Sequence, residues 1–516
     1  IETDANPNTA GWYEYEFPDI NIMTRKGNIL NTAELAEHED IASHGFIKTD
    51  GEYFTGTNDG AHVQFWGTNV IGPGCFPEHD EAEAMADMIA QQGFNLVRFH
   101  QMCGREGNVF LGSDENFKLS AAQMDKLCYF LKQLRSRGIY YFFDLGIDTF
   151  NDGSISQAIP KNPTLAAYFD ETVQNIQIDY AKELLTYADP YDGGRICDNP
   201  ALAAVCCVNE ANLLSHTDKL KSDDSYYFDE LEKLWNQYLQ KQYPSALDKI
   251  SYNKNLNSGE SISKGTVKLG SYDDRNSYTK ARVFDIHKFL NGLQESYFAN
   301  IKAMMTENGI KTLMTGTTLF GMLEPQIMKS NLTTDFIDIH YYWAHPDGYS
   351  LDTGVEFKND TGSMLKDADM GIIGKLANRK PYNTPYTISE WNTCASSMYL
   401  AEGPMLMAAY SKLQNWNPMQ FMFSARGMKN YENERISDVF ANENHPIRIG
   451  TMNAAALLRQ NVREANCACY ADYSGADWYD YTKHSGKTTD TMYKTYDMFD
   501  GDTRNAFLHK TGISLL

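Results

Sequence analysis

"AAVCCVNEANLL", residues 203–214, is a run of small and β-branched residues that ends abruptly in an amide and a carboxylate, Asn209 and Glu210. Continuous apolar runs of this length are typical of strands that are buried on both faces of a parallel sheet. An acid at the exit of such a strand is either a solvated loop residue or part of an active site. The same dipeptide recurs at 433–434 and 442–443 in polar surroundings, so its context has to decide.

Strand-like and helix-like segments alternate along the whole chain. Apolar, β-branched or aromatic runs predict eight strands, at residues 62–70, 94–100, 139–145, 202–208, 311–319, 335–342, 385–391 and 418–424. Helical patterns lie between them, at residues 81–92, 120–137, 405–414 and 450–463 among others. Eight strands that alternate with helices predict a closed (β/α)8 TIM barrel of the α/β class. An open doubly wound sheet is the alternative, but no Gly-x-Gly-x-x-Gly turn follows the first strand.

Three regions depart from the simple repeat. We expect residues 1–60 to form an N-terminal lead-in with a β-hairpin, 61–465 the catalytic barrel, and 466–516 a small C-terminal β-rich extension. A long insertion follows the fourth strand, and its role, like that of the C-terminal extension, is left open by the sequence. Because its middle is rich in Asn, Ser and Lys near 254–264, we expect two helices joined by a flexible loop at the barrel mouth.

Composition restricts the class of partner. The chain is 42% hydrophobic and 13% aromatic, which is ample for a large core and argues against disorder. The net charge of −23 disfavours nucleic acid and anionic membranes, which both select basic surfaces. No stretch approaches the roughly 20 apolar residues that span a bilayer. These features predict an enzyme that acts on a neutral substrate, and they leave the oligomeric state open.

The cysteines and the start of the chain bear on its location. An odd total of nine cysteines cannot pair completely within the chain, and Cys206 and Cys207 lie inside the apolar run. Cys467 and Cys469 are too close together to form a zinc site without further ligands, so we interpret the cysteines as structural thiols. The chain begins at Ile1, which is consistent with a removed leader. We expect a secreted or cell-surface protein, with a cytoplasmic location as the alternative.

Polar residues gather at the predicted carboxyl ends of the strands, where the active sites of such barrels form. The set comprises Asn69, Arg98, His100, Asn209, Glu210, His340, Tyr342, Trp343 and Glu390. Two glutamates therefore leave opposite walls of one barrel, with a permanent cation and a tyrosine between them. Strand alternation places His340 and Tyr342 on the same inward face.

This inventory suits glycoside hydrolysis, which needs one carboxylic acid and one ionised carboxylate. Arg98 and Tyr342 can keep Glu390 ionised. Glu210 leaves an apolar strand, so desolvation should favour its protonated form. Asn209 can bind the sugar 2-OH, a contact that strengthens as the transition state forms.

Four motifs carry a resemblance to the clan A glycoside hydrolases, nearest to family 5 of cellulase-like enzymes. They are GFNLVRFH (93–100), VNEANL (208–213), FIDIHYYW (336–343) and TISEWN (387–392). The resemblance spans roughly residues 60–465, and the four motifs stand in the right order at the right strand ends.

The resemblance implies a retaining β-glycosidase that forms a covalent glycosyl-enzyme. Glu210 would be its acid/base and Glu390 its nucleophile, with carboxyls about 5–5.5 Å apart. Asn209 would contact the 2-OH, while Arg98 and Tyr342 would hold the nucleophile. His340 would line the floor of the catalytic subsite.

The chain departs from the family 5 pattern at the ends of the third and eighth strands. Family 5 enzymes carry a His at the end of strand three, where this chain has Asp144. They also place a Trp after strand eight, where this chain has FMFSARGM (421–428), and Phe423 or Trp343 is the substitute platform that we expect, with Trp343 preferred. The predicted substrate is a plant-type polysaccharide, a β-1,4-glucan or a hemicellulose.

Three alternatives remain beside this hypothesis. The first is an exo-acting β-glycosidase on oligosaccharides, since long mouth loops can close a pocket as well as wall a cleft. The second is a barrel that binds carbohydrate without cleaving it. The third is a metal-dependent barrel hydrolase, which usually has a His-x-His pair after strand one. The first strand here offers WGTNV (66–70) instead, so we expect no metal and no other cofactor.

Overall fold

Eight parallel strands form one sheet that curves into a barrel. The computed structural model describes residues 24, 26–28, 31–34, 40–103, 118–147, 163–319, 324–343, 362–367, 370–395, 397–424, 439–443, 445–472 and 503–514. The barrel strands are β4 (Gly67–Ile71), β5 (Leu96–His100), β6 (Tyr140–Asp144), β7 (Leu202–Val208), β8 (Leu313–Thr317), β9 (Ile337–Tyr342), β10 (Tyr386–Asn392) and β11 (Asn417–Ser424). Their order is β8-β7-β6-β5-β4-β11-β10-β9.

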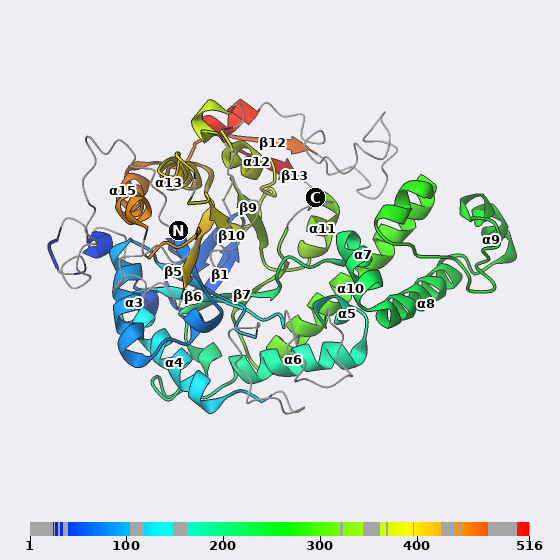
Figure 1. The fold of residues 1–516 in the computed structure, drawn as a ribbon, viewed down its shortest axis with the longest axis horizontal. Helices are drawn as coiled ribbons and strands as arrows, with labels where there is room; N and C mark the ends of the chain where they lie inside the picture. The colour runs from blue at the N-terminus through cyan, green and yellow to red at the C-terminus, as the bar shows by residue number, and fades with distance from the viewer. Residues whose placement is uncertain are drawn as a thin grey trace, which may run out of the picture.

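The two ends of this sheet meet just beyond β8. Leu319 donates its N–H to the carbonyl of Asp338 and accepts from the N–H of His340, which joins β8 to β9. Helices lie outside the strands, as Figure 1 shows. The sequence-based prediction of a (β/α)8 barrel is therefore confirmed, and each of the eight predicted strands is present.

The first predicted strand, 62–70, divides into two elements. His62–Val63 is β3 of a separate antiparallel sheet with β1 (Ile47–Asp50) and β2 (Tyr53–Gly56), and only Gly67–Ile71 enters the barrel. The β1–β2 pair is a hairpin, with Asp50 opposite Tyr53. Its Ile47 and Phe54 belong to the same buried cluster as the inward side chains of the barrel strands. The small sheet therefore closes one end of the barrel.

The lower interior of the barrel is apolar and largely aromatic. Phe54 and Phe142 both pack edge-on against Phe336, and Phe65 packs in the same way against Tyr140. Such rings bury a large area with well-defined geometry. The polar residues of the candidate site lie above this layer, at the carboxyl ends of the strands.

Amphipathic helices bury their apolar faces against the outside of the barrel. The principal ones are α3 (His79–Gln91), α4 (Ala121–Arg135), α6 (Glu171–Leu185), α10 (Lys280–Glu307), α13 (Glu402–Gln414) and α15 (Pro446–Asn461). Side-chain caps define several starts: Ser120 accepts from the N–H of Gln123, and Asp170 accepts from that of Val173. Two shorter helices, α11 (Glu324–Asn331) and α12 (Ile372–Ala377), precede β9 and β10.

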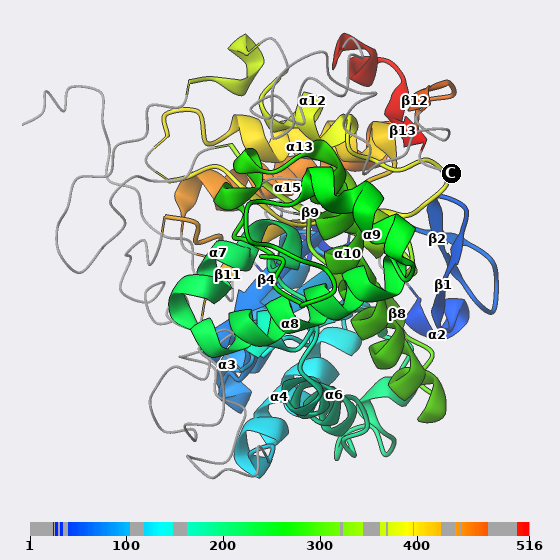
Figure 2. The same ribbon diagram turned by 90° about the vertical axis from the view of Figure 1, so that its right-hand side faces the viewer.

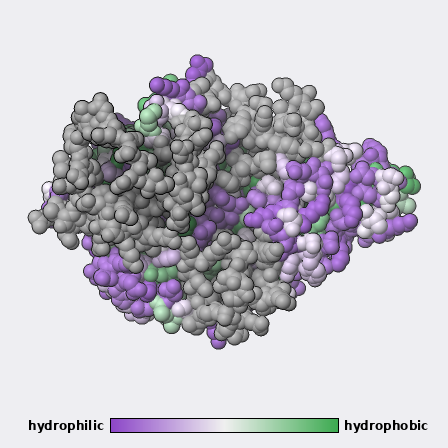
Figure 3. Space-filling model, viewed as in Figure 1, coloured by the Kyte–Doolittle hydropathy of each residue, from purple (hydrophilic) through white to green (hydrophobic). Residues whose placement is uncertain are grey.

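The insertion after β7 forms an arm that extends from one side of the barrel (Figures 1 and 2). It contains α7 (Leu213–Asp223), α8 (Ser225–Gln242) and α9 (Ala246–Tyr252) before the chain returns along α10, so the prediction of two helices was wrong. The Asn/Ser/Lys-rich loop is held by Glu260, whose carboxylate accepts two hydrogen bonds from the buried guanidinium of Arg282. Figure 3 shows a mainly hydrophilic arm with an apolar tip, where Leu247 and Ile250 are exposed.

The C-terminal segment returns to the barrel as a two-stranded parallel sheet. Its strands are β12 (Ala468–Asp472) and β13 (Lys510–Ser514), and the predicted strands after Asp472 lie outside the described residues up to 502. Lys510 donates to Glu52 in the N-terminal hairpin and to Glu464, at 2.5 and 2.6 Å. Buried Lys380 contacts the same Glu52, so this cluster joins the N-terminal hairpin and the C-terminal sheet to the segment that precedes β10.

Seven of the nine cysteines are buried, while Cys467, which precedes β12, and Cys469, which lies in it, are exposed. The expectation that Cys206 and Cys207 are buried is therefore confirmed. Within the described ranges, no helix is long and apolar enough to cross a membrane.

Candidate active site

Strand pairing brings the polar residues of the site together. Asn69 on β4 lies opposite Arg98 on β5, and Glu390 on β10 lies opposite His340 on β9. The register of β10 shifts between Thr387 and Glu390, as at a β-bulge. Bulges re-aim side chains near active sites, and this one lets neighbouring side chains, Ser389 and Glu390, both reach His340.

Glu390 is a buried carboxylate that is held by several donors. Arg98 Nη1 donates to its Oε1 at 2.6 Å, and the Tyr342 hydroxyl donates to its Oε2 at 2.6 Å. Both contacts were predicted from the sequence, and they confirm that Tyr342 points inward. Burial alone would raise the pKa of Glu390, but the charges of His340 and Arg98 outweigh it and lower the pKa to about 2. Glu390 is therefore ionised at neutral pH.

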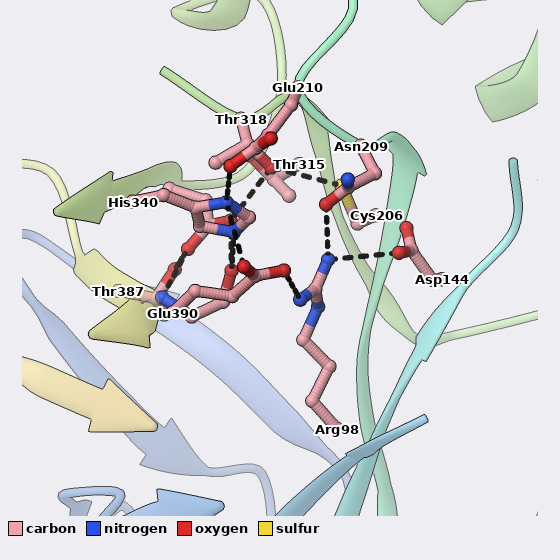
Figure 4. Close-up of polar contacts among 12 residues, drawn as sticks. Arg98, Asp144, Cys206, Asn209, Glu210, Thr315, Thr318, His340, Thr387 and Glu390 are labelled. Atoms are coloured by element: carbon pink, nitrogen blue, oxygen red, sulfur yellow. Dashed lines mark hydrogen bonds and ion pairs between the residues drawn. The ribbon is translucent and has the colours of Figure 1, made fainter. Parts of the chain in front are cut away.

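Arg98 lies behind the site with no exposed side-chain area and connects four partners. Nη1 donates to Asn69 Oδ1 at 3.1 Å as well as to Glu390, and Nη2 donates to Asp144 Oδ2 at 2.9 Å and to Asn209 Oδ1 at 2.7 Å. Figure 4 shows the guanidinium between Glu390, Asp144 and Asn209. Only a planar fork of donors can serve this arrangement. Although burial disfavours the cation, Asp144 and Glu390 raise the pKa of Arg98 above its usual value.

Asp144 completes the buried charge cluster from the end of β6. Its Oδ2 also lies 2.6 Å from His100 Nδ1, and His100 Nε2 lies 3.7 Å from Glu390 Oε1. Burial would raise the pKa of Asp144, but Arg98 and His100 lower it. The position where family 5 enzymes carry a His thus holds a carboxylate that orients a His from the neighbouring strand.

Glu210 follows β7 on a strained turn. Its φ of 43° lies in the left-handed region, which non-glycine residues rarely adopt and which often marks a functional site. The carbonyl of the next residue, Ala211, accepts from the Tyr168 hydroxyl at 2.8 Å and from Thr317 Oγ1 at 2.9 Å. These two hydroxyls hold the turn in place. The Glu210 side chain is 29% exposed, so it is less buried than the sequence led us to expect.

His340 lies between the two glutamates, as Figure 4 shows. Its Nδ1 is 2.6 Å from Glu210 Oε1 and 3.5 Å from Glu390 Oε2. Burial lowers the pKa of His340, but Glu390 and Glu210 outweigh that effect and raise it. One ligand atom from each of the three residues lies within 4.8 Å of the others. The two carboxylates therefore face one another across a single site.

The remaining predicted residues divide by exposure. Asn209 is partly exposed beside Glu210, whereas Asn69, His100 and His340 are buried behind the carboxylates. The buried three hold the charged groups instead of facing the open side, which differs from the expectation that His340 forms a subsite floor.

Of the two expected platform residues, one is excluded. Phe423 has no exposed area and packs against Phe94 in the core, so it is not available to a sugar. Trp343 is partly exposed at the end of β9, where its indole N–H donates to Gly362 and Lys375 lies over the ring. The sequence missed Phe421, which is partly exposed and lies beside His100 and Tyr342 at ring-centroid distances of 6.4 and 6.1 Å.

Three further polar residues complete the site: Asp144, Asp338 and Ser389. Asp144 ends its strand as the other site residues do, so its position alone could have indicated it. Asp338 lies two residues before His340 on the same inward face. Ser389 could not be found by alternation, because it is adjacent to Glu390 and reaches the site only through the bulge in β10.

Solved structures of several glycoside hydrolases are similar to this chain. A β-galactosidase from the Antarctic haloarchaeon Halorubrum lacusprofundi covers 87% of this chain, over 66% of its own length, with 11% identity and a TM-score of 0.53. A glycoside hydrolase family 5 mannosidase from Rhizomucor miehei covers 81% of this chain and 98% of its own, with 10% identity and a TM-score of 0.45. An exo-β-1,4-mannosidase from an Opitutaceae bacterium covers 91% and 71%, with 13% identity and a TM-score of 0.45.

At these identities the likeness concerns the fold. The similarity to the β-galactosidase, whose TM-score exceeds 0.5, agrees with the eight-stranded barrel described above. No protein-family model matches the sequence, and no curated protein sequence matches it either.

Proposed function

We propose that this protein is a retaining β-glycoside hydrolase in which Glu390 is the nucleophile and Glu210 the acid/base. The observation that carries the proposal is a pair of facing carboxylates in unlike surroundings. Glu390 is buried and held ionised by Arg98 and Tyr342, while Glu210 is partly exposed and bound to His340. Their nearest oxygens lie within 4.8 Å. This spacing suits a retaining enzyme, with about 5–5.5 Å between carboxyls, better than an inverting one, with about 6.5–9.5 Å.

The proposed reaction has two steps. Glu210 gives its proton to the glycosidic oxygen as the bond to the anomeric carbon breaks, and Glu390 forms an ester with that carbon. Glu210, now ionised, then takes a proton from a water that attacks the same carbon and releases Glu390. Two inversions leave the anomeric configuration unchanged. Arg98 and Tyr342 hold one oxygen each of the Glu390 carboxylate, and the proposed partner of the sugar 2-OH is Asn209, which is partly exposed beside Glu210.

The proposed substrate is a neutral plant-type polysaccharide, a β-1,4-glucan or a hemicellulose, cleaved by a secreted or cell-surface enzyme. An uncharged glycan agrees with a net charge of −23, which would repel acidic polymers. Aryl β-glycosides of glucose, mannose, galactose and xylose, together with the corresponding polysaccharides, test the sugar. The size distribution of early products separates an endo-acting enzyme from the exo-acting alternative, which releases only short products from one chain end.

Two alanine variants with added azide test the two roles. Glu390→Ala removes the nucleophile, so azide can restore turnover only by attack on the emptied face, and the glycosyl azide is inverted. Glu210→Ala removes the proton donor, so an activated aryl glycoside should keep its first step far better than a natural glycan. Azide should then accelerate the second step of this variant and give a retained glycosyl azide.

Glu171→Ala, at an exposed position at the start of α6, is the matched control and should retain wild-type turnover. If the two site variants exchange these behaviours, the roles are reversed. If both keep full activity, these glutamates are not the catalytic pair. Glycan binding without hydrolysis by the wild type would favour the carbohydrate-binding barrel.

A metal-dependent hydrolase is the second candidate, because Glu210, His340 and Glu390 could together ligate an ion. Against it, the guanidinium of Arg98 already occupies one oxygen of Glu390 and would repel a cation. We expect prolonged treatment with EDTA, followed by gel filtration, to leave hydrolysis unchanged. Loss of activity that Zn²⁺ or Mn²⁺ restores would favour the metal-dependent reaction.

A further inference from the structure

A buried chain of hydrogen bonds runs from the candidate acid into the barrel interior. His340 Nδ1 lies 2.6 Å from Glu210 Oε1, and on the far side of the ring Nε2 lies 2.8 Å from Ser389 Oγ. Ser389 Oγ is in turn 2.6 Å from Asp338 Oδ2. His340, Ser389 and Asp338 are all buried. The chain therefore begins at the open site and ends at a carboxylate that no substrate can reach.

The surroundings of Asp338 decide the direction of these hydrogen bonds. Its Oδ1 accepts from the N–H of Ser389 at 3.1 Å and from the Thr387 hydroxyl, and its Oδ2 accepts from the hydroxyls of Ser389 and Thr318 at 2.6 and 3.2 Å. Burial raises the pKa of Asp338 above its usual value despite the opposing charges of His340 and Arg98, so its charge state has to be judged from the donors around it. An ionised carboxylate only accepts hydrogen bonds, and each oxygen of Asp338 faces two donors. This arrangement indicates that Asp338 is ionised.

A serine hydroxyl has one hydrogen, and here it is directed to Asp338. Ser389 can then only accept from His340, so Nε2 must carry a hydrogen. On the other side of the ring, a single proton lies on the 2.6 Å line between His340 Nδ1 and Glu210 Oε1. It belongs either to Glu210, with a neutral imidazole, or to an imidazolium that donates to the carboxylate.

We propose that Asp338 and Ser389 are positioning residues that fix the tautomer of His340, so that the pair of Glu210 and His340 stores the proton for the leaving group. The inference rests on the proposed role of Glu210 as the acid. In the first step the pair loses one proton to the glycosidic oxygen, and in the second it regains one from the attacking water. With the opposite tautomer, Nδ1–H and a protonated Glu210 would both be donors on one short line, so the acid could not hold its proton there.

Several charges face His340 and set its titration. Glu210 and Glu390 lie on its Nδ1 side, Asp338 is 3.9 Å from Nε2, and Arg98 stands beyond Glu390. Three carboxylates against one guanidinium favour a proton on the ring. Loss of Ser389 would remove the oxygen that accepts from Nε2–H of His340. The imidazole would then no longer be held in the tautomer that carries its hydrogen on Nε2.

The tautomer is measured directly, without substrate, by ¹⁵N NMR of histidine-labelled protein, with the His340 signals assigned by their absence in His340→Gln. We expect Nε2 to remain protonated from pH 5 to 9 in the wild type, while only Nδ1 changes. Ser389→Ala should give a mixture of tautomers, and Ser389→Thr should restore the wild-type spectrum. Ser411→Ala is the matched control, because it removes the hydroxyl of another buried serine, on α13, which donates to the carbonyl of Ala408 and not to the site.

The kinetic test compares phenyl and 2,4-dinitrophenyl β-glycosides of one sugar. For Ser389→Ala we expect kcat/KM on the phenyl glycoside to fall about 10-fold or more, and kcat/KM on the dinitrophenyl glycoside to fall less than about 3-fold. The alkaline limb of the pH profile of kcat/KM on the phenyl glycoside should move to lower pH. Ser389→Thr should recover the activity on the phenyl glycoside, and the control Ser411→Ala should keep it.

Equal losses on both glycosides, or unchanged ring nitrogens in Ser389→Ala, would overturn the inference and leave Ser389 with a packing role. An unprotonated Nε2 in the wild type would overturn it as well. Because the spectrum needs no turnover, a protein without glycosidase activity would refute the proposed function, and its spectrum would still show which ring nitrogen of His340 carries the hydrogen.

Discussion

Replacement of Arg98 by methionine tests the charge cluster behind the two glutamates. The buried guanidinium lies between Glu390 and Asp144, at 2.6 and 2.9 Å. Methionine has a similar length and keeps much of the packing, so the change removes mainly the charge and its donors. We expect a folded but less stable protein whose defect depends on pH.

The magnitude follows from the pKa of Glu390, about 2 against an ordinary 4.5. At about 1.4 kcal/mol per pKa unit, this difference corresponds to about 3 kcal/mol of folding free energy at neutral pH. His340 shares in it, but Arg98 also holds Asp144, and breaking a buried ion pair costs about 3–5 kcal/mol. We therefore expect the free energy of unfolding to fall by about 3–5 kcal/mol at pH 7.

The sign of the pH dependence follows from the direction of the shift. A carboxylate with a lowered folded pKa stabilises the protein fully above its ordinary pKa and loses that effect as pH falls through its folded pKa. The difference between wild type and Arg98→Met should therefore be largest at pH 7 and shrink to about 60% of that value by pH 3. In parallel, the acidic limb of kcat/KM should move to higher pH, since Glu390 would take up a proton more readily.

Urea unfolding followed by tryptophan fluorescence, at several pH values between 3 and 7, measures the stability. Arg135→Met, which breaks the pair with Asp189 away from the site, is the control and should leave the pH profile of hydrolysis unchanged. A stability difference that is constant from pH 3 to 7 would refute the reasoning, because Arg98 would then act through packing instead of charge.

Three further changes address other parts of the molecule. Tyr342→Phe removes the hydroxyl that donates to Glu390 and should lower kcat roughly 10- to 100-fold. The acidic limb of its pH–rate profile should move to higher pH, as steady-state kinetics with an aryl glycoside will show. An unchanged kcat would contradict the role of this contact. Thr317→Val removes one of two hydroxyls that bind the Ala211 carbonyl, so the free energy of unfolding measured with urea should fall by about 1 kcal/mol. Turnover of glycosides with poor leaving groups should fall most. A uniform loss over all leaving groups would count against a role of this hydroxyl in placing Glu210. Lys380→Met breaks the buried contact with Glu52 in the N-terminal hairpin, so it should lower the midpoint of thermal unfolding while kcat stays within about 2-fold of the wild-type value. A large loss of kcat would mean that the contact between Lys380 and Glu52 also supports the active site.

Local sequence patterns were sufficient to predict the barrel and most of the candidate site. Apolar runs such as 202–208 indicate strands buried on both faces, and their alternation with helices leaves few topologies open. Since all parallel strands end at one rim, the polar residues that follow them must converge there. Glu210 and Glu390 could therefore be paired although 180 positions of numbering separate them, and strand alternation placed Tyr342 on the inward face with His340.

How these groups are held depends on contacts between distant parts of the chain. The bulge in β10 lets Ser389 and Glu390 face the same site, which strict alternation forbids. The left-handed turn at Glu210 depends on hydroxyls of Tyr168 and Thr317, which lie far away in the chain. The local sequence pattern predicts which face of a strand or helix a residue occupies, because the geometry of the backbone repeats with a fixed period. Exposure, bulges and hydrogen-bond partners depend on what the rest of the chain packs against that face, and no local period encodes them.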